Sequence, residues 1–278
     1  MTMAFFGISN WDDAYENGAH IPQSDRWPNA WHERATEFRR RTSDEVASEI
    51  DRPYGPAERN RFDLFLPRSP AGLVIYIHGG YWLRLEKGFW SHLAQGPLGH
   101  RFAVAIPSYT LCPAIRLTGI VDEIAAMIEA VAARVDGPII LVGHSAGGHL
   151  ATSMVGEASP LSAGTLSRIL NVVSLSGLHD LRPLMRTTMN AKLRLDQEEA
   201  NRLSPALQLP KPGARVTCWI GSAERSEFQR QSALLANIWR GLGAETSCVV
   251  EPDRHHFDIM EGLSDPMHPL TRCALTFT

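Results

Sequence analysis

Residues 139–152 read IILVGHSAGGHLAT, and this stretch decides the fold class of the chain. A short apolar run, 139–142, leads into a G-x-S-x-G pattern, and small and apolar residues follow it. Between a strand and a helix, this pattern is typical of a strained turn that exposes a serine, because flanking glycines allow close packing. The context predicts that Ser145 is a nucleophile. The alternative is a tight turn with a buried serine.

Five further short apolar runs flank this stretch, and helical patterns separate them. These runs are residues 73–77, 102–106, 172–175, 216–220 and 247–250. Within 120–135, the apolar residues Ile120, Ile124 and Val131 recur on one face at helical spacing. Alternation of strand and helix predicts an α/β fold with a mostly parallel central sheet and helices on both faces. Ligands of such sheets bind beyond the carboxyl ends of the strands, so the chemistry is expected there.

The chain is expected to divide near residue 58. Residues 1–58 are polar and rich in Trp, Arg and Asp, with one helical stretch near 31–41, and we predict an N-terminal extension that packs on the core. Residues 59–278 are predicted to form a single domain, since α/β domains of this size are common. A helical, partly charged stretch, 178–211, interrupts the alternation of predicted strands and helices, and we expect it to form a small cap insertion.

Composition excludes several classes of function. Lys and Arg number 27 against 30 Asp and Glu, which gives a net charge of −3, so nucleic-acid and anionic-membrane partners have no electrostatic support. No apolar run approaches the roughly 18 residues that cross a bilayer, and no signal-peptide pattern opens the chain. The four cysteines form no C-x-x-C pair. A cytoplasmic protein with a small-molecule substrate is expected, and a homodimer stays open.

A second motif, H-G-G-Y-W at residues 78–82, directly follows the strand predicted at 73–77. A Gly-rich loop at that position directs backbone N–H groups toward the oxyanion of a tetrahedral intermediate. We expect the N–H groups of Gly80 and Tyr81, with that of Ala146, to form an oxyanion hole. His78 is expected to be structural, because the base of such a site comes later in the chain.

An acid and a base should follow the nucleophile, in the chain order serine, carboxylate, histidine. Glu224 lies in the loop after the next-to-last predicted strand and is the candidate acid. Glu227 is the runner-up, although it suits the first turn of a helix, where a carboxylate favours the dipole. His255 and His256 follow the last strand, and one of them should face Ser145. No third histidine has matching spacing, so no metal is expected.

Taken together, these motifs resemble the α/β-hydrolase type of kynurenine formamidase (arylformamidase). The resemblance rests on H-G-G-Y-W at 78–82, G-H-S-A-G-G-H-L at 143–150, L-S-G-L-H-D-L-R-P-L at 175–184, and E-F-Q-R-Q-S at 227–232 with the later His256-Phe257. It implies the α/β-hydrolase fold, with Ser145 as nucleophile and His256 as base. Glu224 falls where the family usually has aspartate, and both acids occur in such triads.

The resemblance implies a serine hydrolase that cleaves an aryl formamide, N-formylkynurenine, to kynurenine and formate through a formyl-enzyme, without a cofactor. A carboxylesterase or thioesterase for small acyl groups, with the same triad, is the alternative, and bacterial relatives carry such labels. A binding protein without catalysis is a third interpretation. The substrate carboxylate would need a cation, for which Arg84, Lys87, Arg116 and Arg186 are available.

Aromatic residues near the two motifs are candidates for the wall of an acyl or aryl pocket. Trp82 belongs to the H-G-G-Y-W motif, and Tyr109 follows the strand predicted at 102–106. Burial in the core explains aromatic residues equally well. Both are therefore candidate substrate-binding residues with a core role as the alternative.

Overall fold

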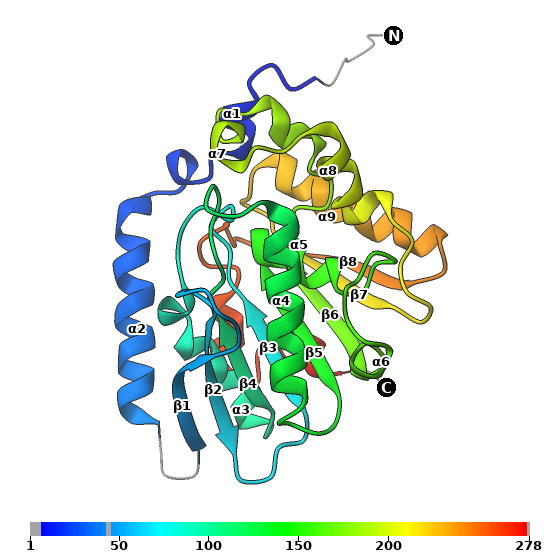
Figure 1. Cartoon of the computed structure of the whole chain (residues 1–278). Helices are drawn as coiled ribbons and strands as arrows, with labels where there is room; N and C mark the ends of the chain where they lie inside the picture. The colour runs from blue at the N-terminus through cyan, green and yellow to red at the C-terminus, as the bar shows by residue number, and fades with distance from the viewer. Residues whose placement is uncertain (1–6, 43–45, 277–278) are drawn as a thin grey trace.

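The computed structural model describes residues 7–42 and 46–276. An eight-stranded sheet runs through the molecule in the order β1-β2-β4-β3-β5-β6-β7-β8 (Figure 1). The strands are β1 (Val46–Pro53), β2 (Arg61–Pro67), β3 (Leu73–Ile77), β4 (Ala103–Pro107), β5 (Ile139–His144), β6 (Ile169–Leu175), β7 (Arg215–Gly221) and β8 (Glu245–Glu251). Strand β2 runs antiparallel to both of its neighbours, and β3 to β8 are parallel.

Ten helices accompany the sheet in the described residues, and α3 to α9 lie between its parallel strands. They are α1 (Trp11–Tyr15), α2 (Trp27–Arg41), α3 (Gln95–Gly99), α4 (Leu117–Ala132), α5 (Ala146–Ser153), α6 (Ala163–Arg168), α7 (Asn190–Leu193), α8 (Gln197–Arg202), α9 (Ser226–Gly241) and α10 (Pro269–Leu275). In Figure 1, α4 and α5 lie in front of the sheet, and α1, α7, α8 and α9 gather at one end. The predicted α/β fold is confirmed.

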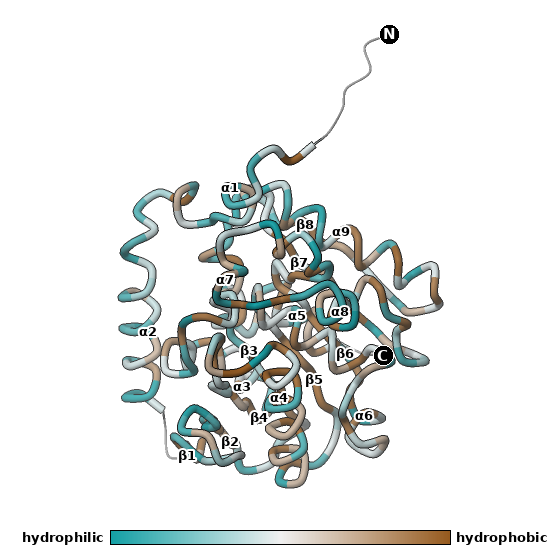
Figure 2. The backbone as a smooth tube through the Cα atoms, turned by 45° about the horizontal axis from the view of Figure 1, so that its top comes forward, coloured by the Kyte–Doolittle hydropathy of each residue, from teal (hydrophilic) through white to brown (hydrophobic). Residues whose placement is uncertain are grey.

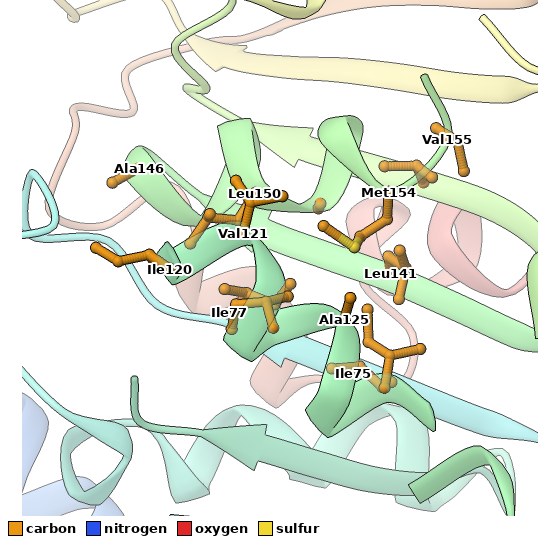
Figure 3. Close-up of a cluster of buried hydrophobic side chains, with 14 of the residues drawn as sticks. Ile75, Ile77, Ile120, Val121, Ala125, Leu141, Ala146, Leu150, Met154 and Val155 are labelled. Carbon is orange, nitrogen blue, oxygen red and sulfur yellow. The ribbon is translucent and has the colours of Figure 1, made fainter. Parts of the chain in front are cut away.

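Alternate side chains of the central strands enter two separate cores. On β3, Ile75 and Ile77 face α4 and α5, where they meet Ile120 and Leu150 (Figure 3). The intervening Tyr76 faces the other layer. All of these side chains are almost fully buried. Burying one large aliphatic side chain contributes about 1.5–3 kcal/mol, so these cores hold the carboxyl ends of the strands in fixed positions. Figure 2 shows the corresponding contrast in hydropathy: the central strand β5 is hydrophobic (brown), whereas α8 is hydrophilic (teal).

The first strand of the sheet lies inside the segment expected to be an N-terminal extension. Strand β1 pairs with β2, with a bulge between Glu49 and Arg52, so the sheet begins before the boundary predicted at residue 58. Its burial pattern explains the difference, since most of its side chains are exposed and leave no apolar run in the sequence. Helix α2 begins at Trp27, four residues before the predicted stretch, and packs on the core through Trp31 and Ala35.

The stretch between β6 and β7, where the sequence predicts a small cap insertion over 178–211, contains short helical segments. It holds α7, α8 and two 3-10 turns, at Arg182–Arg186 and Pro205–Leu207. Buried Glu199 of α8 ties this cap to the start of α4, since it accepts from Arg116 at 2.6 Å and from the Thr118 hydroxyl at 2.8 Å. Within residues 7–42 and 46–276, no helix is long and apolar enough to span a membrane.

Candidate active site

A sharp turn between β5 and α5 presents Ser145. The serine has φ 56° and ψ −118°, a backbone conformation that costs free energy and recurs at functional sites. Both flanking glycines are obligatory: a Cβ on Gly143 would lie 2.0 Å from the carbonyl oxygen of Gly147, and one on Gly147 would lie 1.9 Å from that of Ile77. Ser145 N–H donates to the Leu175 carbonyl at 2.7 Å, which fixes the turn against β6.

Of the two adjacent histidines, His256 joins the candidate site. Its Nδ1 lies 2.7 Å from Oε2 of Glu224, and the Glu224 side chain is fully buried. The second oxygen of Glu224, Oε1, accepts from the Gly221 N–H at 3.1 Å and from the hydroxyl of Ser176. Sequence reasoning missed Ser176, although the residue lies in the L-S-G-L-H-D segment directly after β6. Three donors, the imidazole among them, therefore fix the position of the buried carboxylate.

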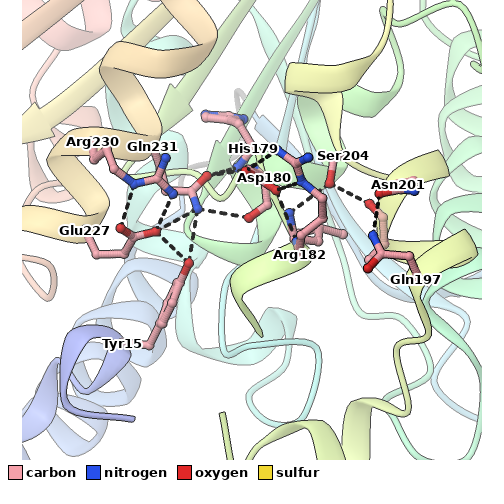
Figure 4. A network of polar contacts seen from close by, with 12 residues as sticks. Tyr15, His179, Asp180, Arg182, Gln197, Asn201, Ser204, Glu227, Arg230 and Gln231 are labelled. Atoms are coloured by element: carbon pink, nitrogen blue, oxygen red, sulfur yellow. Dashed lines mark hydrogen bonds and ion pairs between the residues drawn. The ribbon is translucent and has the colours of Figure 1, made fainter. Parts of the chain in front are cut away.

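Glu227, the other candidate acid, lies in a separate polar network. Its oxygens accept from the Tyr15 hydroxyl at 2.6 Å, from Arg230 at 2.7 Å and from Gln231 at 3.0 Å (Figure 4). This network ties the end of α1 to α9, and burial beside the Glu227 carboxylate raises the pKa of the Tyr15 hydroxyl far above its ordinary value. Glu227 therefore anchors the N-terminal segment, and Glu224 is the carboxylate beside His256.

The H-G-G-Y-W loop lies directly against the serine turn. A Cβ on Gly79 would lie 2.9 Å from the Ser145 Cβ, so only glycine permits this approach. Gly80 and Tyr81 have positive φ angles, of 108° and 54°. Among the described residues, no acceptor is recorded for the N–H groups of these two residues, and Ala146 N–H is in the first turn of α5, where intrahelical acceptors are lacking. Three donors are thus available for an oxyanion.

A cavity of about 300 Å³ opens over Ser145. Its polar wall includes His144, Ser145 and His256, together with Gly80 and Tyr81 of the H-G-G-Y-W loop. Its remaining wall comes from an aromatic and apolar set, Pro28, Trp31, Leu85, Trp90 and Phe257, and from a hydrophilic set, Glu16, Asn17, Gly18, Ser24, Asp25 and Arg84. The segment from Glu16 to Trp31 therefore supplies a wall of the cavity. A larger open groove of about 800 Å³ beside α2 contains none of the candidate catalytic residues.

Trp82 and Tyr109, the two aromatic residues considered for the pocket, lie in the core instead. Both are fully buried, and neither is among the residues that line the cavity. Trp82 packs edge-on against His149, and Tyr109 stacks on His78 at 4.5 Å between ring centroids. For Trp82, closeness to the motif in sequence is misleading, because Tyr81 and Trp82 have left-handed backbone angles that turn their side chains in different directions. Tyr81 lines the cavity in their place.

The remaining histidines near the site are structural. His78 Nδ1 lies 2.7 Å from the Gly79 carbonyl oxygen, and burial lowers its pKa to about 4. His149 binds the Leu203 carbonyl of the cap at 2.7 Å, and burial lowers its pKa to about 4 as well. His144 binds the His256 carbonyl oxygen at 2.9 Å, and burial holds its pKa well below the ordinary value. His255 packs edge-on against Trp27.

The candidate site contains no cluster suited to a metal ion. Within the parts of the chain that the structure describes, no group of three or more His, Cys, Asp or Glu residues is arranged to bind one. The cavity itself presents a hydroxyl on a strained turn, an imidazole with a buried carboxylate partner, and N–H groups without a recorded acceptor.

The chain is similar in sequence and in fold to several known proteins. Residues 74–259 match the family model of the alpha/beta hydrolase fold. The kynurenine formamidase of Danio rerio is 31% identical over 238 residues, which cover 81% of this chain and 80% of that enzyme. A crystal structure of a candidate thioesterase from Silicibacter sp. TM1040 superimposes with a TM-score of 0.89 at 42% identity, over 97% of this chain and all of that one. Esterase B of Lactobacillus rhamnosis, at 17% identity and a TM-score of 0.65, shares the fold over 90% of this chain and 92% of its own.

The fold, the strained serine turn and the family match define an α/β hydrolase. Within that class, the identity and the coverage of the fish enzyme are decisive, and the chain belongs to the kynurenine formamidase family.

Proposed function

We propose that this protein is an arylformamidase that hydrolyses N-formylkynurenine to kynurenine and formate. The observation that carries the proposal is one cavity of about 300 Å³ that joins Ser145 and His256, the latter held by Glu224, to a wall of aromatic side chains. This volume is at the lower end of the range for small-molecule sites, which is roughly 300–1,000 Å³. A compact aryl substrate with a one-carbon acyl group suits such a cavity.

The first half of the reaction transfers the formyl group to the enzyme. Ser145 Oγ attacks the formamide carbon while Nε2 of His256 takes the hydroxyl proton, and the Glu224 carboxylate stabilises the imidazolium that forms. The oxyanion accepts from the N–H groups of Gly80, Tyr81 and Ala146. His256 then donates its proton to the aryl nitrogen as the C–N bond breaks. That protonation is essential, because an anilide anion is a poor leaving group.

The second half of the reaction releases formate. A water molecule attacks the formyl carbon of the ester on Ser145 while His256 takes its proton. The tetrahedral intermediate uses the same three N–H groups. It collapses with return of the proton from His256 to Ser145 Oγ, which restores the enzyme and releases formic acid, and this loses its proton to solvent as formate.

A carboxylesterase or thioesterase is the second candidate function, since the structural neighbour at 42% identity is described as a candidate thioesterase. The two functions share the acylation chemistry and differ in the leaving group. Only the formamide requires protonation of an arylamine in the transition state, whereas an aryl ester or a thioester leaves without it.

Substrate competition separates the two functions. N-formyl-L-kynurenine, a short-chain p-nitrophenyl ester and an acetyl thioester would be compared by kcat/KM in one preparation. For an arylformamidase we expect kcat/KM of about 10⁴ M⁻¹s⁻¹ or more on the formamide, which is ordinary for an enzyme on its own substrate, and lower values on the others. Efficient thioester or ester cleavage without formamide cleavage would refute the proposal in favour of the second candidate.

A further inference from the structure

Among the described residues, Asn17 of the N-terminal segment is a buried polar side chain that lines the cavity without a recorded protein partner. Asn17 is 5% exposed and lines the cavity, yet no hydrogen bond of its side-chain amide is recorded among the described residues. Most buried side-chain polar groups in proteins have a partner. A buried amide that opens into a cavity and lacks one is therefore available to a ligand.

The residues just before Asn17 in the chain bind both the oxyanion loop and α9. The carbonyl oxygen of Tyr15, two residues earlier, accepts from the Tyr81 hydroxyl at 2.5 Å, and Tyr81 also belongs to the candidate oxyanion loop. The Tyr15 hydroxyl donates to buried Glu227 of α9. Asp13 of α1 forms an ion pair with Arg225 at 2.5 Å. The segment is thus fixed relative to the reacting groups, which a specificity contact requires.

A cation shares the wall of the cavity with Asn17. Among the described residues that line the cavity, Arg84 is the one lysine or arginine, and no hydrogen bond or ion pair of its guanidinium is recorded. Its backbone N–H donates to the Gly80 carbonyl oxygen at 3.2 Å, so it is anchored to the oxyanion loop. The three other cations considered from the sequence have partners elsewhere: Lys87 binds Asp63 at 2.8 Å, Arg116 binds Glu199 at 2.6 Å, and Arg186 lies over the Trp11 ring.

Both signs of charge are present on this wall. Glu16 and Asp25 line the cavity beside Arg84, and no partner of the Asp25 carboxylate is recorded among the described residues. A purely anionic ligand would be repelled by these carboxylates, and a purely cationic one by Arg84. A zwitterion satisfies both.

From these observations we propose that Asn17 and Arg84 form a subsite for the α-carboxylate of an amino acid, with the acidic residues of the same wall facing its ammonium group. The inference deepens the proposed function and rests on it for the identity of the substrate. The amide and the guanidinium would bind the amino-acid end of an aryl substrate while its formamide lies over Ser145. The N-terminal segment would thereby select amino-acid substrates over simple aryl formamides.

Product binding tests this subsite without turnover. Kd values for L-kynurenine and for 2-aminoacetophenone, which keeps the aryl ketone and lacks the amino-acid group, would be measured by calorimetry on the wild type. The variants are Arg84→Met, Asn17→Ala and Asn17→Asp, with Arg240→Met as the matched control, because Arg240 is exposed on α9 and does not line the cavity. Circular dichroism would verify the fold of each variant.

We expect the wild type to bind L-kynurenine roughly tenfold or more tightly than 2-aminoacetophenone, the range for hydrogen bonds to a charged group. Arg84→Met and Asn17→Ala should remove most of that preference, Asn17→Asp should weaken L-kynurenine binding further, and Arg240→Met should change neither Kd. Equal binding of the two ligands by the wild type, or an unchanged preference in both Arg84→Met and Asn17→Ala, would overturn the subsite. Failure of the proposed function appears separately, as absence of formamide cleavage.

Discussion

Replacement of Glu224 by glutamine changes one atom and should reverse the tautomer of His256. In the native site, Oε1 of Glu224 accepts from two donors, the Gly221 N–H and the Ser176 hydroxyl, while Oε2 accepts from Nδ1 of His256 at 2.7 Å. A backbone N–H can only donate, so the amide oxygen of the introduced glutamine must face Gly221. Its NH₂ group then faces His256 Nδ1, which becomes the acceptor. The proton moves to Nε2, where Ser145 needs a base.

The size of the effect follows from that geometry. The wrong tautomer removes the general base, and loss of the carboxylate removes the charge that stabilises the imidazolium. The corresponding aspartate-to-asparagine change in a serine protease lowers kcat by about 10⁴. A similar factor here corresponds to about 5 kcal/mol in the barrier, since each factor of ten in rate costs about 1.4 kcal/mol. The volume of the side chain is unchanged, so the fold should stay intact.

The assay compares Glu224→Gln with Glu227→Gln on N-formyl-L-kynurenine and on a p-nitrophenyl ester, with thermal melts of both variants. Glu227→Gln is the matched control, because Glu227 is a second buried glutamate three residues after Glu224. Its carboxylate accepts from Tyr15 and Arg230 rather than from His256. We expect Glu227→Gln to lose stability and to keep kcat within a few-fold. If Glu224→Gln retains most of the activity, or if Glu227→Gln alone abolishes it in folded protein, the assignment of the acid is wrong.

Three further predictions concern the supports of the site. Ser176→Ala removes a hydrogen bond to a buried carboxylate, worth about 1.5–3 kcal/mol, and should lower kcat for the ester about tenfold; unchanged kcat would show that the hydroxyl does not position the acid. Gly147→Ala places a Cβ 1.9 Å from the Ile77 carbonyl oxygen and should prevent folding or activity, which a wild-type melt and rate would contradict. Stability should fall as pH drops from 6.5 toward 4, because His78 and His149 stay neutral in the folded state, with pKa values of about 4, and take up protons only on unfolding. Urea titrations at pH 7 and pH 5 should differ by about 1.4 kcal/mol per pH unit below 6.5 for each histidine, and identical midpoints would refute this.

The parallel strands and the candidate catalytic residues could be predicted because each carries a local signal. Strands buried on both faces are continuous apolar runs, and β3 begins and ends where the sequence predicts. The serine turn needs glycines at fixed offsets, since a Cβ there meets backbone atoms. Chain order and position after strands predict Glu224, with Glu227 as runner-up, and the pair His255 and His256, from which the family resemblance selects His256.

Other features depend on tertiary contacts that leave no local pattern. Strand β1 is mostly exposed, so its pairing with β2 cannot be recognised from apolar periodicity. The cavity wall formed by Asn17 and Trp31 requires knowledge of how the N-terminal segment docks on α9 and on the oxyanion loop. Trp82 is adjacent to Tyr81, yet only Tyr81 lines the cavity, because the direction of a side chain in a loop depends on backbone angles that the sequence does not specify.

The most direct test of the proposed mechanism is the rate at which purified protein releases kynurenine and formate from N-formyl-L-kynurenine, with Ser145→Ala as the control. We predict equal amounts of the two products, with kcat/KM of about 10⁴ M⁻¹s⁻¹ or above for the wild type and no enzymatic rate for Ser145→Ala. Absence of formamide hydrolysis by folded wild type, or hydrolysis that survives in Ser145→Ala, would contradict the mechanism.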